Sequence, residues 1–141
     1  MKTGKQELDR VLKQHKLWMD SDGKKGDPPP SFHDANFRGA DLEGIKLYGT
    51  IFHRANFEGA NLKNSNLKNC RFDGANFKNA DLDGANLSGA NFIGVDLTRA
   101  KFKINFRDVG WFYNVTVSKD QLCWLILHPR YTEWRSTLRI V

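Results

Sequence analysis

The chain has 141 residues, a formal net charge of +6 and 27% charged residues, which fits a single domain. It has no apolar run near the roughly 18 residues of a membrane helix and no apolar N-terminal segment typical of a signal peptide. We therefore expect a cytoplasmic protein that does not enter a membrane.

The positive charge is not concentrated along the middle of the chain. Residues 31–102 carry nine basic and eight acidic side chains, so this part is nearly neutral. A nucleic-acid groove needs a basic stripe with stacking aromatics, so a nucleic-acid partner is disfavoured. Cys70 and Cys123 suggest no disulfide framework and are interpreted as buried free thiols.

Residues 3 to about 20 are predicted to form an amphipathic helix. Thr3 and Gln6 resemble a capping box at its start. The residues at helical spacing are Leu8, Val11, Leu12, His15 and Trp18. Such a helix either covers the open end of the segment that follows or docks a partner. Residues 21–30 are rich in Gly and Pro and form a linker, so residues 1–30 are one capping unit.

From residue 32 to residue 102, every fifth residue is Leu or Phe. These inward core positions are Phe32, Phe37, Leu42, Leu47, Phe52, Phe57, Leu62, Leu67, Phe72, Phe77, Leu82, Leu87, Phe92, Leu97 and Phe102. Asn or Asp usually precedes the central residue, and Gly or Asn often stands two places after it. Asn or Asp before the central residue is typical of side chains that bond the backbone at turns. Gly or Asn two places after it is typical of corners.

A longer period of twenty residues sorts the same positions into columns, such as Phe32, Phe52, Phe72 and Phe92. The simplest account is an all-β solenoid with four five-residue sides per coil, in which residues twenty apart stack at the sheet spacing of about 4.8 Å. Outward charges alternate in sign at the same period, as in Arg38, Glu58 and Lys78, or in Glu43, Lys63, Asp83 and Lys103. Each such pair is expected to form a cross-strand contact.

Segments such as Ala-Asn-Phe-Glu-Gly at 55–59 and Ala-Asn-Leu-Ser-Gly at 85–89 resemble the pentapeptide-repeat proteins. The resemblance implies a right-handed quadrilateral β-helix, here of about four coils over residues 31–103. It also implies a possible homodimer through the C-terminal cap, because family members often dimerise through C-terminal helical segments.

The repeat frame is expected to end after Phe102, and residues 104–141 are predicted to form a C-terminal cap. Residues 111–117 read as a strand. Ser118 and Gln121 resemble a capping box that starts a helix over residues 119–128, before Pro129. Tyr131, Trp134 and Leu138 suggest a final short helical or irregular segment.

One outward face, beside the Phe32 column, is less regular than the others. The candidate interaction face consists of His33, Ile51, His53, Arg71 and Ile93. Its two isoleucines indicate a cover, supplied either by the terminal segments or by a partner. The two histidines are expected to stack about 4.8 Å apart, with Asp73 next, which provides too few ligands for a metal site.

The sequence contains no nucleophile–base pair, metal-ligand spacing or phosphate loop, so we predict a non-enzymatic protein without a cofactor. The favoured hypothesis is a protein-interaction or scaffold module with an unknown protein partner. The resemblance offers an alternative, because some pentapeptide-repeat proteins bind DNA gyrase or topoisomerase IV as DNA mimics and confer quinolone resistance. The near-neutral body and positive net charge disfavour it. A catalytic or nucleotide-binding role of residues 104–141 is a third hypothesis.

Overall fold

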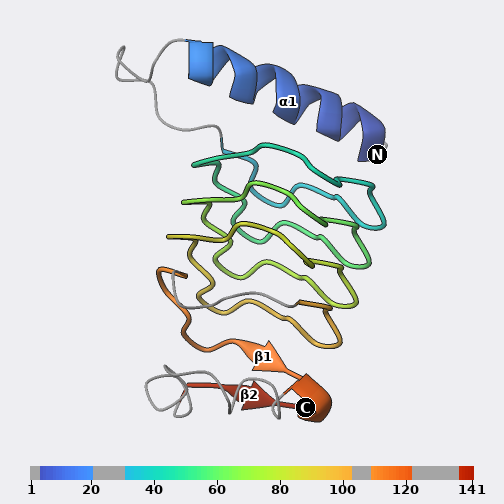
Figure 1. Cartoon of the computed structure of the whole chain (residues 1–141), viewed down its shortest axis with the longest axis vertical. Helices are drawn as coiled ribbons and strands as arrows, with labels where there is room; N and C mark the ends of the chain where they lie inside the picture. The colour runs from blue at the N-terminus through green and yellow to red at the C-terminus, as the bar shows by residue number, and fades with distance from the viewer. Residues whose placement is uncertain (1–3, 21–30, 103–108, 122–136) are drawn as a thin grey trace.

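A computed structural model of the chain describes residues 4–20, 31–102, 109–121 and 137–141. In chain order these contain helix α1 (Gly4–Asp20), strand β1 (Thr116–Val117) and strand β2 (Arg139–Ile140). Between α1 and β1 the chain forms stacked coils, with α1 across one end of the stack and β1 and β2 at the other (Figure 1). The coils therefore separate the two terminal elements.

Parallel β-bridges join residues twenty positions apart and recur every five residues, from Ser31↔Ile51 to Asp81↔Lys101. The backbone N–H of most central residues donates to a carbonyl on the next coil, as from Phe52 to Arg71 at 2.7 Å. Four sides of five residues thus complete one coil, which matches the twenty-residue period of the sequence.

The central Leu and Phe side chains fill the interior of the coils. All of them are buried except Phe102, which is half-buried. Phe52 and Phe72 stack with ring centroids 5.6 Å apart, and Phe57 and Phe77 stack at 4.8 Å. Each fully buried ring of this kind stabilises the fold by roughly 1.5–3 kcal/mol. Because like stacks on like, the columns form one continuous core.

Asn and Asp side chains before the central residues tie down the outward turns. Asn56 Oδ1 accepts the backbone N–H of Glu58 at 3.0 Å, and Asn76 Oδ1 accepts that of Lys78 at 3.0 Å. At the following corners the backbone enters the left-handed region, which Gly and Asn tolerate best, as at Gly59 with φ 67°. The predicted roles of both residue types are confirmed.

Helix α1 contacts the first coil through His15 and Trp18. His15 Nε2 lies 3.0 Å from the carbonyl oxygen of Tyr48, and the Trp18 ring stacks on Tyr48 with centroids 6.4 Å apart. The prediction that Leu12 belongs to the covered face is wrong, since its side chain is 40% exposed. Leu12 lies about 120° around the helix from Trp18 and so falls at the edge of that face. Thr3 lies outside the described residues.

The prediction that the repeat frame ends after Phe102 is wrong. Bridges Asn91↔Trp111 and Asp96↔Thr116 restore the twenty-residue register. Phe112 lies under Phe92, with ring centroids 6.3 Å apart. Counting by fives from Phe102 reaches Arg107, then Phe112 and then Val117, so only one slot lacks an apolar residue.

Residues 111–117 are therefore two sides of a further coil and not one extended strand. Asn114, at φ 52°, makes the corner between them. Only Thr116 and Val117 form a strand, β1, which pairs in parallel with β2 through Thr116↔Arg139 and Val117↔Ile140. A two-residue strand such as β2 leaves no pattern that sequence reasoning could detect.

Ser118 and Gln121 form the predicted capping contact. The Ser118 backbone N–H donates to Gln121 Oε1 at 2.7 Å, and the Gln121 amide donates to the carbonyls of Leu97 and Ala100 at 2.7 and 2.8 Å. Residues 119–121 are helical, while the rest of the predicted helix 119–128, together with Tyr131 and Trp134, lies outside the described residues. Leu138 is half-buried and not helical.

Among the described residues only part of the predicted charge ladders is present, and Lys103 lies outside those residues. Arg38 and Glu58 form a cross-coil ion pair at 3.5 Å. Lys63, expected beside Glu43 and Asp83, has its Nζ 3.3 Å from Asp81, and Lys78 pairs with Asp96 at 3.3 Å. The long lysine side chains reach the acidic residue that precedes a central Leu. This carboxylate is less exposed than those at the outward positions.

Candidate interaction face and neighbouring groove

The residues of the candidate interaction face lie side by side on successive coils. A chain of bridges runs Ser31↔Ile51↔Arg71↔Asn91↔Trp111. Of the candidate face, Ile51 and Arg71 therefore occupy one column. His33 and Arg71 are exposed, whereas Ile51, His53 and Ile93 are half-buried. The two isoleucines are therefore neither covered completely nor freely exposed.

A short polar network occupies the middle of this face. The rings of His33 and His53 lie 4.8 Å apart in an edge-on arrangement, the spacing expected from the sequence. His53 Nε2 lies 2.9 Å from Asp73 Oδ2, and the same carboxylate oxygen lies 3.6 Å from Arg71 Nε. The His53–Asp73 contact has the distance of an ion pair but not the angles of a hydrogen bond.

Burial lowers the pKa of His53 below its ordinary value, and this effect outweighs the opposing attraction of Asp73. His53 is therefore neutral near pH 7. Among the described residues no group of three or more His, Cys, Asp or Glu side chains could hold a metal ion. The network thus links side chains of neighbouring coils across the middle of this face.

Two exposed aromatic residues extend the face beyond the predicted set. Trp111 is 67% exposed and Tyr113 is 51% exposed. Trp111 continues the Ile51 column, and Tyr113 lies twenty residues after Ile93 and accepts the backbone N–H of Gly94 through its carbonyl at 2.8 Å. Sequence reasoning missed them because it ended the frame at Phe102, although the five-residue count continues through Phe112.

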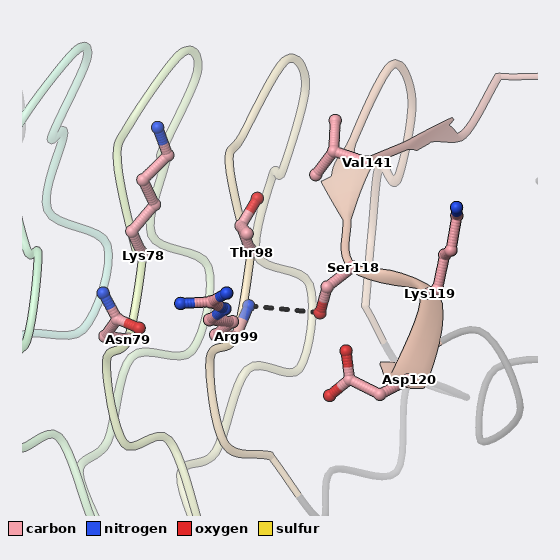
Figure 2. A pocket seen from close by; sticks show the side chains of 8 residues that line it. All are labelled: Lys78, Asn79, Thr98, Arg99, Ser118, Lys119, Asp120 and Val141. Carbon is pink, nitrogen blue, oxygen red and sulfur yellow. Dashed lines mark hydrogen bonds between the residues drawn. The ribbon is translucent and has the colours of Figure 1, made fainter.

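A second feature, a groove, lies on the neighbouring side of the coils near their C-terminal end. Its volume is about 470 Å³. The lining residues are Lys78, Asn79, Thr98, Arg99, Ser118, Lys119, Asp120 and Val141. Figure 2 shows the Arg99 guanidinium extending from its own coil toward Asn79, with Ser118 and Asp120 on the other side of the Arg99 backbone. None of these residues belongs to the predicted site.

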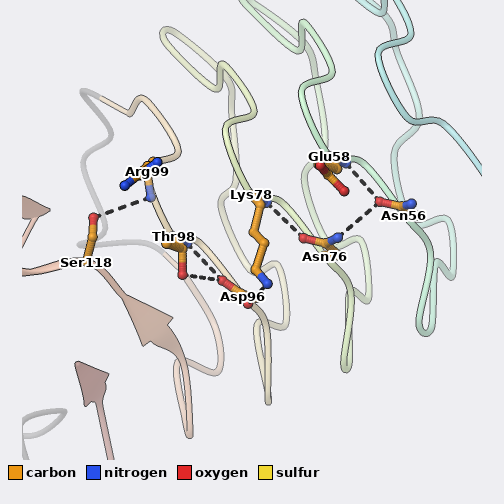
Figure 3. Close-up of polar contacts among 8 residues, drawn as sticks. All are labelled: Asn56, Glu58, Asn76, Lys78, Asp96, Thr98, Arg99 and Ser118. Atoms are coloured by element: carbon orange, nitrogen blue, oxygen red, sulfur yellow. Dashed lines mark hydrogen bonds and ion pairs between the residues drawn. The ribbon is translucent and has the colours of Figure 1, made fainter. Parts of the chain in front are cut away.

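Polar side-chain contacts across three coils stabilise the wall of the groove (Figure 3). Asn76 donates to Asn56 at 3.2 Å, and Lys78 Nζ lies 3.3 Å from Asp96. Thr98 donates to Asp96 through both its hydroxyl, at 2.6 Å, and its backbone N–H, at 2.9 Å. Burial alone would raise the pKa of Asp96, but these partners outweigh it and lower the pKa, so Asp96 stays ionised.

Cys70 offers no nucleophile. Its side chain is fully buried, and its thiol donates to the carbonyl of Leu47 at 2.8 Å. Burial raises the pKa of Cys70 to about 12. Because the thiolate is the reactive form, Cys70 is inert in the folded protein. Cys123 lies outside the described residues.

Comparison with known proteins assigns the family. The profile of the pentapeptide repeat region matches residues 30–109, more than half of the chain. The chain belongs to the pentapeptide-repeat family. Members of this family fold as right-handed quadrilateral β-helices, and they are generally non-enzymatic, scaffold-type proteins. No curated protein matches the chain.

Solved structures that resemble this pentapeptide-repeat chain include Rfr23 and QnrB1. Rfr23, a pentapeptide repeat protein from the cyanobacterium Cyanothece 51142, matches with a TM-score of 0.53 and 29% identity, over 65% of this chain and 59% of that one. Trypsin-treated QnrB1, a plasmid-mediated fluoroquinolone resistance protein, matches with a TM-score of 0.54 and 16% identity, over 68% of this chain and 54% of that one. At this identity the likeness to QnrB1 concerns the fold alone. No helix among the described residues is long and apolar enough to cross a membrane.

Proposed function

We propose that this pentapeptide-repeat chain is a non-catalytic binding module that uses the interaction face extended by Trp111 and Tyr113 to bind another protein. In this proposal about four coils form a rigid body, and α1 and the C-terminal segment close its two ends. The observation that carries the proposal is the exposure of Trp111 and Tyr113, 67% and 51%, beside Ile93 on hydrogen-bonded coils.

The physical argument rests on what such residues do at interfaces. Trp, Tyr and Arg are enriched among the residues that contribute most to protein–protein affinity, and this face presents all three types. Their backbones are fixed by bonds between coils, such as that from Phe92 N–H to Trp111 O at 2.7 Å. A surface that is already ordered loses little conformational entropy when a partner binds.

A site-specific crosslinking experiment tests this proposal. A photoreactive amino acid at position 71 should give a reproducible protein adduct in cells that express the chain naturally, and Trp111→Ser should reduce that adduct severalfold. Leu17→Ser, on the exposed side of α1, is the control and should leave it unchanged. Either no adduct at position 71 or an adduct insensitive to Trp111→Ser would refute the proposal.

The alternative, protection of DNA gyrase or topoisomerase IV, gains no support from the charges of the described coils. Acidic side chains there are paired with basic ones, as in Asp34–Arg54, Glu58–Arg38 and Asp96–Lys78. A DNA mimic needs instead a continuous negative surface that reproduces the phosphates. The homodimer, the cytoplasmic location and the absence of a cofactor stay predictions from the sequence.

A further inference from the structure

The interaction face presents two outward columns that run along the stack of coils, one on each side of the buried Phe32 column. The column before it consists of Ser31, Ile51, Arg71, Asn91 and Trp111, which are joined by bridges. The column after it consists of His33, His53, Asp73, Ile93 and Tyr113, whose carbonyls from His53 onward accept N–H groups of the preceding coil. Each coil therefore contributes one residue to either column at the same height.

The two columns are complementary to each other on two of the coils. At the third level Arg71 and Asp73 carry opposite charges, and their side chains are exposed and half-buried, respectively. They lie 3.6 Å apart, which is longer than a hydrogen bond, so each can still form hydrogen bonds with a bound protein. At the fifth level Trp111 and Tyr113 are both exposed aromatic rings. One column thus carries the groups that the other could bind.

Two-fold symmetry turns this complementarity into a dimer contact. An axis along the stack, between two faces laid against each other, exchanges the two columns and keeps every coil level with its copy. Arg71 then meets Asp73 of the second copy, and the reverse pair forms as well. Trp111 meets Tyr113 of the second copy in the same way, and such aromatic pairs stack favourably. Each contact therefore occurs twice.

The charges select both this orientation and a second copy as the occupant. An axis across the coils would set each column against itself. Arg71 and Asp73, on the middle one of five levels, would then each face a like charge. Arg54 is matched by Asp34 at the corner of the face, and Arg71 is matched by Asp73. Besides its histidines the face thus carries no net charge that would oppose self-association.

We propose that the interaction face binds a second copy of this chain in a parallel two-fold dimer, with the axis along the coils. The inference rests on the proposed function, because it names the protein that the same face binds. It differs from a homodimer through the C-terminal cap, which the family resemblance implies. Five levels at about 4.8 Å make the face only about 20 Å tall, which is small for an interface. The dimer should therefore dissociate on dilution.

Charge reversals followed by sedimentation velocity test the inference on the full chain. The parent should approach twice the mass of the chain at concentrations up to about 1 mM, where even a weak interface forms. Arg71→Asp and Asp73→Arg should each weaken association about tenfold or more, because each sets like charges against each other. An equimolar mixture of the two variants should associate again, since position 71 of either chain then faces an opposite charge at position 73 of the other.

Two further variants separate binding from folding. Arg38→Asp is the control, because Arg38 is another exposed arginine beside a carboxylate, that of Glu58, on the neighbouring side of the coils. It should associate as the parent does. The double variant with both reversals at positions 71 and 73 restores opposite charges across the contact and should also associate. A monomeric parent, single variants that associate as tightly as the parent, or a mixture that stays monomeric would overturn the proposal.

The inference and the proposed function can fail separately. When both hold, the adduct formed at position 71 in cells has twice the mass of the chain, and Asp73→Arg reduces it. If the parent is monomeric but position 71 still gives an adduct with a different protein, and Trp111→Ser reduces that adduct, only the inference fails. If the dimer forms but position 71 gives no adduct in cells, the proposed function fails.

Discussion

The coils of residues 31–102 and the continuation at 109–117 share one register but differ in composition. In the first region the outward positions are mostly polar or charged, and some of them pair with the next coil, as Arg38 does with Glu58 at 3.5 Å. In the second the inward positions Phe112 and Val117 are still buried, while Trp111 and Tyr113 face solvent. The inward positions determine the register, and the outward positions are free to carry other chemistry.

The strength of the core should differ between the two regions. Phe72 packs against four other rings, with centroids 5.1–5.8 Å away, and is fully buried, whereas Phe112 lies 6.3 Å from Phe92 and is 6% exposed. We expect Phe72→Ala to lower the free energy of unfolding by about 3–5 kcal/mol and Phe112→Ala to lower it by clearly less. Urea unfolding followed by circular dichroism measures both. Equal losses would mean that the continuation is as integral to the core as the central coils.

Substitutions at the two arginine corners, Arg54 and Arg99, which both have positive φ, should separate the free-energy cost of the left-handed backbone from the stabilisation that the arginine side chain supplies. Asn adopts the left-handed region more readily than Arg, so Arg99→Asn should raise the free energy of unfolding by up to about 1 kcal/mol. Arg54→Asn should gain less, because it also removes the two bonds to Asp34. Thermal unfolding of the two variants and the parent measures the difference. A lower stability of Arg99→Asn would show that the guanidinium has a structural partner.

The inward residues could be predicted from the sequence because a five-residue period admits few folds. The Leu and Phe columns, the Asn-bonded turns and the Gly corners all followed from it. The groove could not be predicted, because it depends on which way Arg99 and Lys119 point and on Ser118, which holds the Arg99 backbone at 3.3 Å. Trp111 and Tyr113 could have been predicted from the same five-residue count. The polar Arg107 at one inward position interrupted the Leu and Phe pattern and hid its continuation.

Substitutions in the polar network of the interaction face should have the smallest effect, which is a change in the way stability depends on pH. Because burial lowers the pKa of His53, the unfolded chain takes up a proton near pH 6.5 that the folded chain resists. Its contribution to stability is therefore full above pH 6.5 and is lost as the pH falls below that value. His53→Gln should flatten the pH dependence of the unfolding free energy between about pH 7 and 5.

Asp73→Asn should act in the opposite direction. The Asp73 carboxylate raises the pKa of His53 and so opposes the effect of burial. Without it the pKa falls further, and stability should drop more steeply below pH 6.5. Urea titrations at a series of pH values compare the parent with the two variants. Parallel curves for all three would mean that His53 is as well hydrated in the folded chain as in the unfolded one, and that this face is not a desolvated surface prepared for a partner.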